Sequence, residues 1–265
     1  MTERLLQGWE PELPSSDSWL LAAARNHARH YDGLAEAMGW RRPATTALAG
    51  GASGIPTAFA NMTVLTSPAT EPEGAEGVRA ARLLATELQV PILVVSPWPT
   101  PDLAPDGFEL VGHPPLMLRP AGGAGPEPPT ELEITRAASS EDVMDFQRAA
   151  AAGYPAPELA DPVARPLFGA PALDAGWVFF CGRVGGGPVC TAAGHVSDGV
   201  QVVELVSTLA EQRGKRYGEA ITWAATMIDP TLPAMLVASD LGRPVYERMG
   251  FRALCRWTFW VALPG

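Results

Sequence analysis

A basic turn that carries two glycines occupies residues 212–222 and reads QRGKRYGEAIT. The run before it, residues 202–207, is rich in β-branched residues and is bounded like a buried strand. The run after it, residues 219–228, is apolar almost all round, as a packed helix would be. A helix that starts here points free N–H groups and the positive end of its dipole at the turn. Cations and residues without a Cβ at that point favour a bound diphosphate, and the turn supplies Arg213, Lys215, Arg216, Gly214 and Gly218.

The composition indicates a globular chain with a large core, because 47% of its 265 residues are hydrophobic and 18% are charged. The formal net charge of −10 opposes a nucleic-acid partner, which would need a basic face. No apolar run approaches membrane-spanning length, and the first residues lack the pattern of a signal peptide. We therefore expect a cytoplasmic protein with neither a nucleic-acid nor a membrane partner. The sequence does not specify its oligomeric state.

The cysteine and histidine residues predict no metal site. Cys181, Cys190 and Cys255 are odd in number and form no CxxC pair, so they indicate small core residues. His27 and His30 lie three residues apart without an evident third ligand, which favours a solvated helix face over a metal. His195 has two interpretations, a structural histidine or a residue that lines an acceptor pocket.

A composition break at residues 120–129, with the sequence PAGGAGPEPP, divides the chain. Such a segment cannot bury apolar surface and predicts an extended or flexible linker. We therefore expect one domain over residues 1–120, a linker over 121–130 and a second domain over 131–265.

The two halves share internal similarity. PILVVS at residues 91–96 resembles PAMLVAS at 233–239, and DGF at 106–108 resembles MGF at 249–251, so a duplicated unit is the simplest account. Where the second half has its basic turn, the first has EPEGAEG at residues 71–77. Acids there would repel a phosphate, so we expect the first copy to have lost the ligand.

Hydrophobic periodicity and turn residues predict an α+β fold, with helices flanking a mixed sheet in each half. A two-residue turn at Asp198-Gly199 predicts a β-hairpin between two strands of the second half. The expected helices are 18–38, 78–88, 140–151 with Ser139 or Ser140 as its cap, 219–228, and a short one ending at Gly250. The expected strands are 59–66, 91–96, 108–111, 116–119, 132–136, 176–181, 189–195, 200–208, 234–238 and 254–261.

Residues 131–263 resemble the GNAT superfamily of acyl-CoA-dependent N-acyltransferases. Residues 213–218 match its phosphate motif, Gln/Arg-x-x-Gly-x-Gly/Ala, except that Arg216 stands at the first motif glycine. Residues 238–251, ASDLGRPVYERMGF, look like the family's late strand and short helix ending in Tyr-x-x-x-Gly-Phe. Ser239 stands where the family often has Asn. The first half resembles a degenerate GNAT copy, which implies a tandem protein.

The resemblance implies acetyl-CoA as co-substrate and a primary amine that attacks the thioester directly. Backbone groups of Val206, Ser207 and Thr208 would pair with the pantetheine arm, and Ser239 would give a weaker polar contact to it. The diphosphate would be held by the turn, that is by Arg213, Gly214, Lys215, Arg216, Tyr217 and Gly218.

Two side chains are candidates for proton transfer. Tyr246 falls at the position of the family's usual proton donor to the departing thiolate, although it could instead only pack against CoA. Glu204 could take the proton of the acceptor, although a change of one residue in register would turn it to solvent.

The competing function is a non-catalytic CoA-binding sensor or scaffold. The acceptor stays open between a small-molecule amine, an amino acid, an antibiotic and a peptide N-terminus, and the acyl-chain preference is equally open. Variable loops form acceptor pockets in this superfamily, here with residues 153–174 and the N-terminal copy as candidates.

Overall fold

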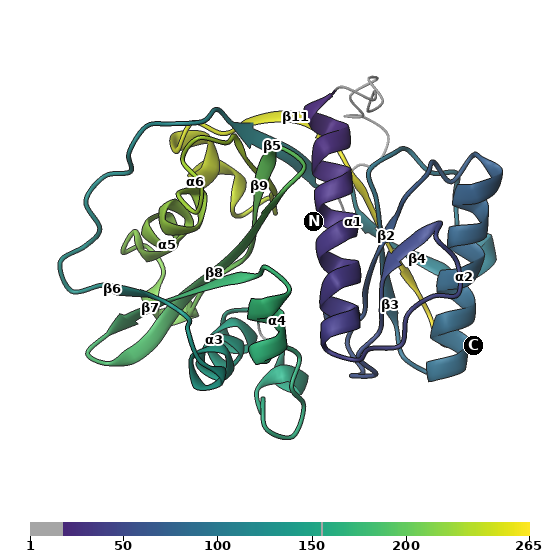
Figure 1. The fold of residues 1–265 in the computed structure, drawn as a ribbon, viewed down its shortest axis with the longest axis horizontal. Coiled ribbons are helices and arrows are strands. Elements are labelled where there is room, and N and C mark those ends of the chain that lie inside the picture. Colours follow the sequence, from purple (N-terminus) through teal and green to yellow (C-terminus); the bar gives the residue numbers. More distant parts are fainter. Residues whose placement is uncertain (1–17, 155) are drawn as a thin grey trace. The chain divides into compact units, whose positions relative to one another are not determined.

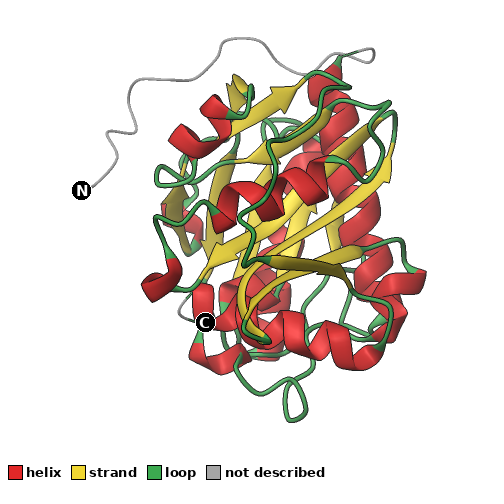
Figure 2. Ribbon diagram, turned by 90° about the vertical axis from the view of Figure 1, so that its left-hand side faces the viewer, coloured by secondary structure: helices red, strands yellow, loops and turns green. Residues whose placement is uncertain are grey.

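A computed structural model describes residues 18–154 and 156–265 of the chain, which contain both helices and strands (Figures 1 and 2). The α-helices are α1 (Trp19–Ala37), α2 (Pro72–Leu88), α3 (Ser140–Gly153), α4 (Ala170–Asp174), α5 (Tyr217–Thr226) and α6 (Arg243–Arg248). The first strands are β1 (Leu48–Gly50), β2 (Met62–Leu65), β3 (Ile92–Ser96), β4 (Phe108–Gly112), β5 (Pro115–Arg119) and β6 (Glu133–Arg136). The others are β7 (Val178–Val184), β8 (Gly187–Ser197), β9 (Val200–Thr208), β10 (Ala234–Val237), β11 (Arg252–Arg256) and β12 (Thr258–Ala262).

The strands form two mixed sheets, which confirms the predicted α+β class. The first sheet has the order β1-β2-β3-β12-β4, and the second has the order β11-β5-β10-β9-β8-β7-β6. In the first sheet β2 and β3 run parallel, and in the second β9 and β10 do so.

Helices α1 and α2 cover opposite faces of the first sheet (Figure 1). Successive residues of β3 explain this arrangement, because Ile92 and Val94 enter the core under α2 while Leu93 and Val95 are buried on the other face. Helix α1 begins at its cap Ser18, whose hydroxyl accepts a hydrogen bond from the Leu21 N–H. The predicted helix 18–38 is therefore present with nearly the expected bounds.

Strands β8 and β9 form the predicted hairpin of the second sheet. Asp198 and Gly199 both have positive φ, 54° and 76°, as the tight turn requires. Successive β8 residues face opposite sides of the sheet. Gly194 packs under α5, and the His195 ring contacts Trp177 on the other side. Helices α3 and α5 accordingly lie on opposite faces of this sheet (Figure 1).

The predicted terminal strand 254–261 is two strands that belong to different sheets. Trp257 interrupts it, so that β11 ends the second sheet and β12 enters the first between β3 and β4. Strand β5 shows the converse. It follows β4 of the first sheet in the sequence, but it lies in the second sheet between β11 and β10. The compact units are accordingly not contiguous: the first joins residues up to Met117 to Val237–Arg243 and Arg252–Gly265, and the second holds Leu118–Leu236 and Pro244–Phe251.

The segment 121–130 has no helix or strand, yet it is held in place within the second unit. The Arg119 guanidinium lies 4.4 Å from the centre of the Trp223 ring and donates to the Gly122 carbonyl at 2.8 Å. Gly125 packs so closely on the same indole that a Cβ there would lie 2.6 Å from it. The segment is extended, as predicted, but it is docked.

Helix α2 begins six residues before the predicted start at residue 78. Pro72 occupies its first turn and Glu73 lies near its N-terminus, where a fixed φ and a negative charge both stabilise a helix. Gly74 and Gly77 are buried in this helix, so their missing Cβ atoms serve close packing. The acidic segment 71–77 is therefore a helix start, and the expected turn is wrong.

Candidate active site

Strands β9 and β10 stop pairing part-way along β9, which leaves the rest of the β9 edge without a β10 partner among the described residues. Among the described residues their parallel ladder covers two pairs, Gln201 with Ala234 and Val202 with Met235. Strand β9 continues six residues further, to Thr208. This stretch contains every β9 residue that the sequence predicted for the site: Glu204, Val206, Ser207 and Thr208.

A β-bulge distorts β9 at this point. The pairing of β8 with β9 shifts between Thr191 and Ala193, and Leu205 has a left-handed backbone with φ of 53°. The Thr191 hydroxyl holds the bulge, since its Oγ1 lies 3.0 Å from the Leu205 carbonyl and 2.8 Å from Ser207 Oγ. A bulge re-aims the groups around it, and no period-2 pattern in the sequence reveals it.

The basic turn joins the end of β9 to the start of α5, as predicted. Gly214 and Arg216 both have left-handed backbones, with φ of 80° and 66°. Arg216 is the N-cap of α5, and no side chain caps the helix. The departure from the family motif thus falls where a glycine would adopt the required φ without strain.

Gly218 packs against the end of β9. A Cβ at this position would lie 3.0 Å from Thr208 Oγ1, so the first turn of α5 approaches the strand closely because the residue is glycine. Within the described residues, the N–H groups of this first turn have no capping side chain. They and the dipole of α5 are therefore available to an anion.

The three cations of the turn are exposed, and each already has a local partner. Arg213 donates from Nε to the Thr208 carbonyl at 3.2 Å and from Nη2 to the Gly153 carbonyl at 3.4 Å. Lys215 donates to Gln212 Oε1 at 2.8 Å, and Arg216 lies 3.4 Å from Glu219. Contacts this exposed contribute little to stability, so the cations can turn to a diphosphate at low cost.

The ring of Tyr217 lies near the turn, with its centre 5.9 Å from Lys215 Nζ. It is buried, and its hydroxyl donates to Glu131 Oε1 at 2.9 Å. Loss of hydration and this hydrogen bond raise the pKa of Tyr217 above its ordinary value. Only its backbone N–H can serve a ligand at the turn.

Tyr246 lies on α6 with its ring against Phe251, at 6.0 Å between ring centres. Its exposed fraction is 9%, and this burial raises the pKa of its hydroxyl to about 12. A phenol with this pKa stays protonated at neutral pH and can donate its proton.

Glu204 does not face open solvent, because its side chain is 11% exposed and packs against His195. Its Oε1 lies 3.5 Å from Nε2 of His195, which is fully buried and makes an edge contact with Trp177. Of the two sequence interpretations of His195, this position supports a structural neighbour of Glu204.

Ser239 follows β10 and is exposed. Its hydroxyl accepts a hydrogen bond from the Gly242 N–H at 3.2 Å, so it holds the turn that precedes α6. The residue belongs to the first compact unit. The role of Ser239 toward pantetheine stays a prediction.

Tyr154 contacts the candidate site, and the sequence did not single it out. It follows the end of α3, and its hydroxyl donates to the Val206 carbonyl at 2.8 Å. Tyr154 is 46% exposed, and it interacts electrostatically with Tyr246 and Glu204. The Val206 carbonyl therefore already has a partner. The one sequence signal was the position of Tyr154 at the start of the expected acceptor loop, residues 153–174.

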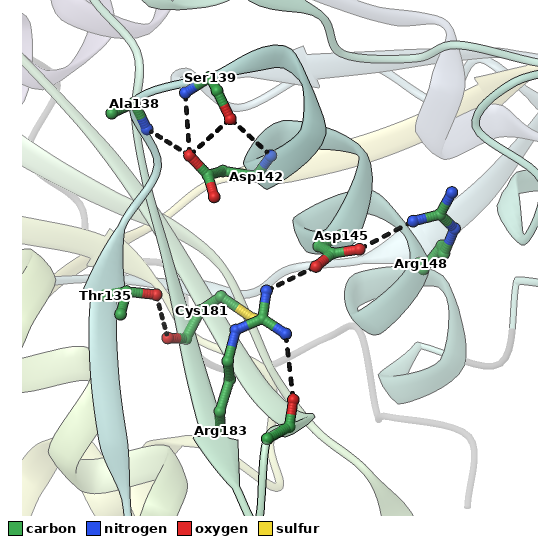
Figure 3. A network of polar contacts seen from close by, with 9 residues as sticks. Thr135, Ala138, Ser139, Asp142, Asp145, Arg148, Cys181 and Arg183 are labelled. Carbon is green, nitrogen blue, oxygen red and sulfur yellow. Dashed lines mark hydrogen bonds and ion pairs between the residues drawn. The ribbon is translucent and has the colours of Figure 1, made fainter.

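Helix α3 is anchored near its N-terminus by a network of polar contacts (Figure 3). Ser139 and Asp142 form a capping box, as the predicted Ser139 cap allows. One turn later Asp145 accepts hydrogen bonds from Arg148 at 2.8 Å and from Arg183 of β7 at 2.6 Å. At the other end Gly153 packs on Ser207 so closely that a Cβ would overlap Oγ.

The remaining candidates do not form a metal site. In residues 18–154 and 156–265 no group of three or more His, Cys, Asp or Glu side chains could hold a metal ion. His27 and His30 are buried, with His27 against Trp257 at 4.6 Å, so the predicted solvated face is wrong. The cysteines Cys181, Cys190 and Cys255 are buried and free, and no helix among the described residues could cross a membrane.

The whole chain resembles solved acetyltransferase structures. A GCN5-related N-acetyltransferase from Kribbella flavida is 22% identical with a TM-score of 0.65, and the match covers 94% of this chain and 97% of that one. A putative acetyltransferase of the GNAT family from Novosphingobium aromaticivorans is 19% identical over 89% of this chain and 99% of that one, with a TM-score of 0.52. This chain has the GNAT fold.

The tandem arrangement also has a counterpart among solved structures. A tandem GNAT protein from the clavulanic acid biosynthesis pathway is 13% identical, with a TM-score of 0.50, over 91% of this chain and 95% of that one. The two sheets described above fit this arrangement. No protein-family model matches the sequence, and no curated protein matches it either. The GNAT likeness therefore rests on structure, and the motif residues agree with it.

Proposed function

We propose that the protein is an N-acetyltransferase that moves the acetyl group of acetyl-CoA to a primary amine. One observation carries this proposal: the strands β9 and β10 part beside the uncapped, cation-rich start of α5. A GNAT fold alone would be compatible with many functions, whereas this feature has the chemistry of a CoA-binding site.

The residues present fit the diphosphate of CoA. The N–H groups of 214–218 and the α5 dipole would bind its oxygens, and Arg213, Lys215 and Arg216 would supply positive charge. The open backbone of β9 would pair with the pantetheine arm through the groups of Val206, Ser207 and Thr208. Because the Val206 carbonyl bonds to Tyr154, either this bond opens on binding or pairing uses the neighbouring groups.

Glu204 and Tyr246 would move the two protons of the reaction. Glu204 takes a proton from the acceptor ammonium, which frees the nitrogen lone pair to form the C–N bond at the thioester carbonyl. As the C–S bond breaks, the Tyr246 hydroxyl gives its proton to the leaving thiolate. The nitrogen loses its second proton as the amide forms, this proton restores the Tyr246 hydroxyl by way of water, and Glu204 releases its own proton to solvent. The products are the amide and the free thiol of CoA.

The first copy, by the same criteria, would bind no CoA. Strands β2 and β3 stay paired over three residue pairs, from Met62 with Leu93 to Val64 with Val95. At the start of α2, the backbone of Gly74 packs directly on the Pro68 carbonyl oxygen, which fills the space that a diphosphate would need. Carbonyl oxygens and the nearby acids would both repel an anion.

We assign the CoA-binding function to residues 131–265, with 121–130 as the linker and 1–120 as the degenerate copy. The net charge of −10 favours a cationic acceptor, such as a small-molecule amine or a peptide N-terminus, and opposes nucleic acid. We expect the reaction to occur in the cytoplasm, where acetyl-CoA is available.

Calorimetric titration with acetyl-CoA, followed by a free-thiol assay with a panel of primary amines, tests this function. We expect micromolar binding and thiol release that depends on the amine. Absence of heat at high micromolar acetyl-CoA would remove the basis of the proposal. Binding without thiol release for any amine would instead support the competing function, a CoA-binding sensor or scaffold.

A further inference from the structure

His195 lies buried at the centre of the second sheet, in contact with the one carboxylate that the proposed reaction uses. Its exposed fraction is 0%, and its Nε2 atom lies 3.5 Å from Glu204 Oε1. The sequence predicted either a structural histidine or an acceptor-pocket residue, and neither interpretation anticipates this pairing.

The strand register explains why the two side chains meet. His195 of β8 pairs with Val202 of β9, and Glu204 pairs with Ala193. Each residue is therefore the diagonal neighbour of the other on adjacent antiparallel strands, which is within reach of long side chains. The β-bulge begins at the next residue, Leu205, and ends the regular pairing of β8 with β9. Glu204 is therefore the last β9 residue of the regular hairpin register.

The surroundings fix the imidazole more firmly than the carboxylate. The Trp177 ring meets the His195 ring edge-on at 4.7 Å, and Trp177 is itself buried against Phe179. Glu204 retains 11% exposure and lies electrostatically close to Tyr154, which in turn lies close to Tyr246. A fully buried histidine thus lies against a carboxylate that keeps some exposure and interacts electrostatically with Tyr154.

We propose that His195 is a positioning residue that acts through Glu204. The imidazole attracts Oε1 and holds the carboxylate in one orientation, so that Oε2 is directed at the ammonium of the acceptor. His195 itself touches no substrate. This role rests on the proposed function, because it gives Glu204 the task of accepting the proton.

A double-mutant cycle of Glu204→Gln and His195→Leu tests this role, with kcat as the readout. The probes are acetyl-CoA and the fastest of four amines: benzylamine, putrescine, lysine and trialanine. We expect Glu204→Gln to lower kcat about 100-fold and His195→Leu about 10-fold. The double variant should be no slower than Glu204→Gln alone, because His195 has no carboxylate left to orient.

Two further variants control for packing. His195→Gln keeps a side-chain N–H donor of similar length, so it should recover most of the loss that His195→Leu causes. His30→Leu removes a buried histidine of the first unit, and its effect should simply add to that of Glu204→Gln. The acetyl-CoA Kd should stay unchanged in all variants of Glu204 and His195, since neither residue lies in the turn.

A multiplicative loss in the double variant, with no recovery in His195→Gln, would overturn the proposal and leave His195 as a packing residue. If acetyl-CoA binds but no amine turns over, nitrogen NMR of the imidazoles decides the matter. Glu204→Gln should then shift the ring signals of His195 but not those of His27, His30 or His113. Unmoved His195 signals would reject the contact, and failure of acetyl-CoA to bind at all would reject the proposed function instead.

Discussion

The β2–α2–β3 segment of the first half and the β9–α5–β10 segment of the second half share one order of elements, a strand, a helix and a parallel strand. In the first, the strands pair over three residue pairs, and Gly74 in the first turn of the helix packs on the Pro68 carbonyl. In the second, the strands part after two pairs and the helix begins with a left-handed Arg216 and no cap. Neither helix start has a side-chain cap, so under the proposed function the two halves differ in the open edge of the strand and in the cations at the start of α5.

Removing the first half entirely tests how far the second half is independent. A fragment of residues 131–265 lacks β5, which lies between β10 and β11 in the second sheet. Its unpaired strand edges and apolar surface should make the fragment aggregate or stay poorly soluble. Gel filtration and circular dichroism measure this.

The matched control for the fragment is the full chain with a protease site placed in 121–130 and cut after folding. This cut leaves every strand in place, so the nicked protein should stay folded. A monodisperse, cooperatively unfolding 131–265 fragment would contradict the importance of the exchanged strand.

Replacing Arg213 and Lys215 together by Ala should weaken acetyl-CoA binding at least 100-fold. Each charge-assisted hydrogen bond to phosphate is worth about 1.5–3 kcal/mol, and about 1.4 kcal/mol corresponds to tenfold in Kd. Calorimetric titration gives the Kd. The matched pair in the first half, Glu73→Ala with Glu76→Ala, should leave the Kd unchanged, and new binding at α2 would break the comparison.

Tyr246→Phe should lower kcat about tenfold by the same factor from pH 6 to pH 9. Burial raises the pKa of Tyr246 from 10 to about 12, so the hydroxyl stays protonated, and available as a donor, throughout this range. Initial rates against pH measure the ratio. Tyr31→Phe, in the first unit, is the control, and an unaffected rate in Tyr246→Phe at every pH would remove the donor role.

Arg216→Gly should raise stability by about 0.5–1 kcal/mol, because it relieves a left-handed side-chain residue at the cost of some chain entropy. The loss of one exposed cation should weaken acetyl-CoA binding only a few-fold. Calorimetric unfolding and titration give both values. Gly214→Ala, at φ of 80°, should destabilise by about 1 kcal/mol, and a stabilising effect there would contradict the strain assigned to this turn.

Local patterns predicted most elements of both halves. The hairpin at Asp198-Gly199, the Ser139 cap of α3 and the strand–turn–helix order around residues 212–222 depend on nearby residues alone, and all are present. The start of α2 was misplaced because acids and glycines were interpreted as a turn. The burial of His27 and His30 was missed because charge pattern alone does not say which face of α1 packs.

The sequence predicts the candidate site as a place on the chain but not as a set of contacts. Residues 213–218 follow from the motif, whereas the meeting of Tyr154 with Val206 joins residues that are 52 positions apart. The meeting of His195 with Glu204 follows from the regular register of the β8–β9 hairpin, but the burial of the histidine against Trp177 does not follow from local pattern.

The sequence by itself determined the α+β class, the duplicated halves and the basic turn, since hydrophobic period, glycine and charge act over a few residues. Tertiary structure alone decided which sheet contains β5 and β12 and where the pairing of β9 with β10 ends. It also decided that the side chain in contact with Glu204 is His195. The physical reason is that strand partners are chosen by competition among distant segments for the same hydrogen bonds and buried surface, and the winner depends on the whole chain.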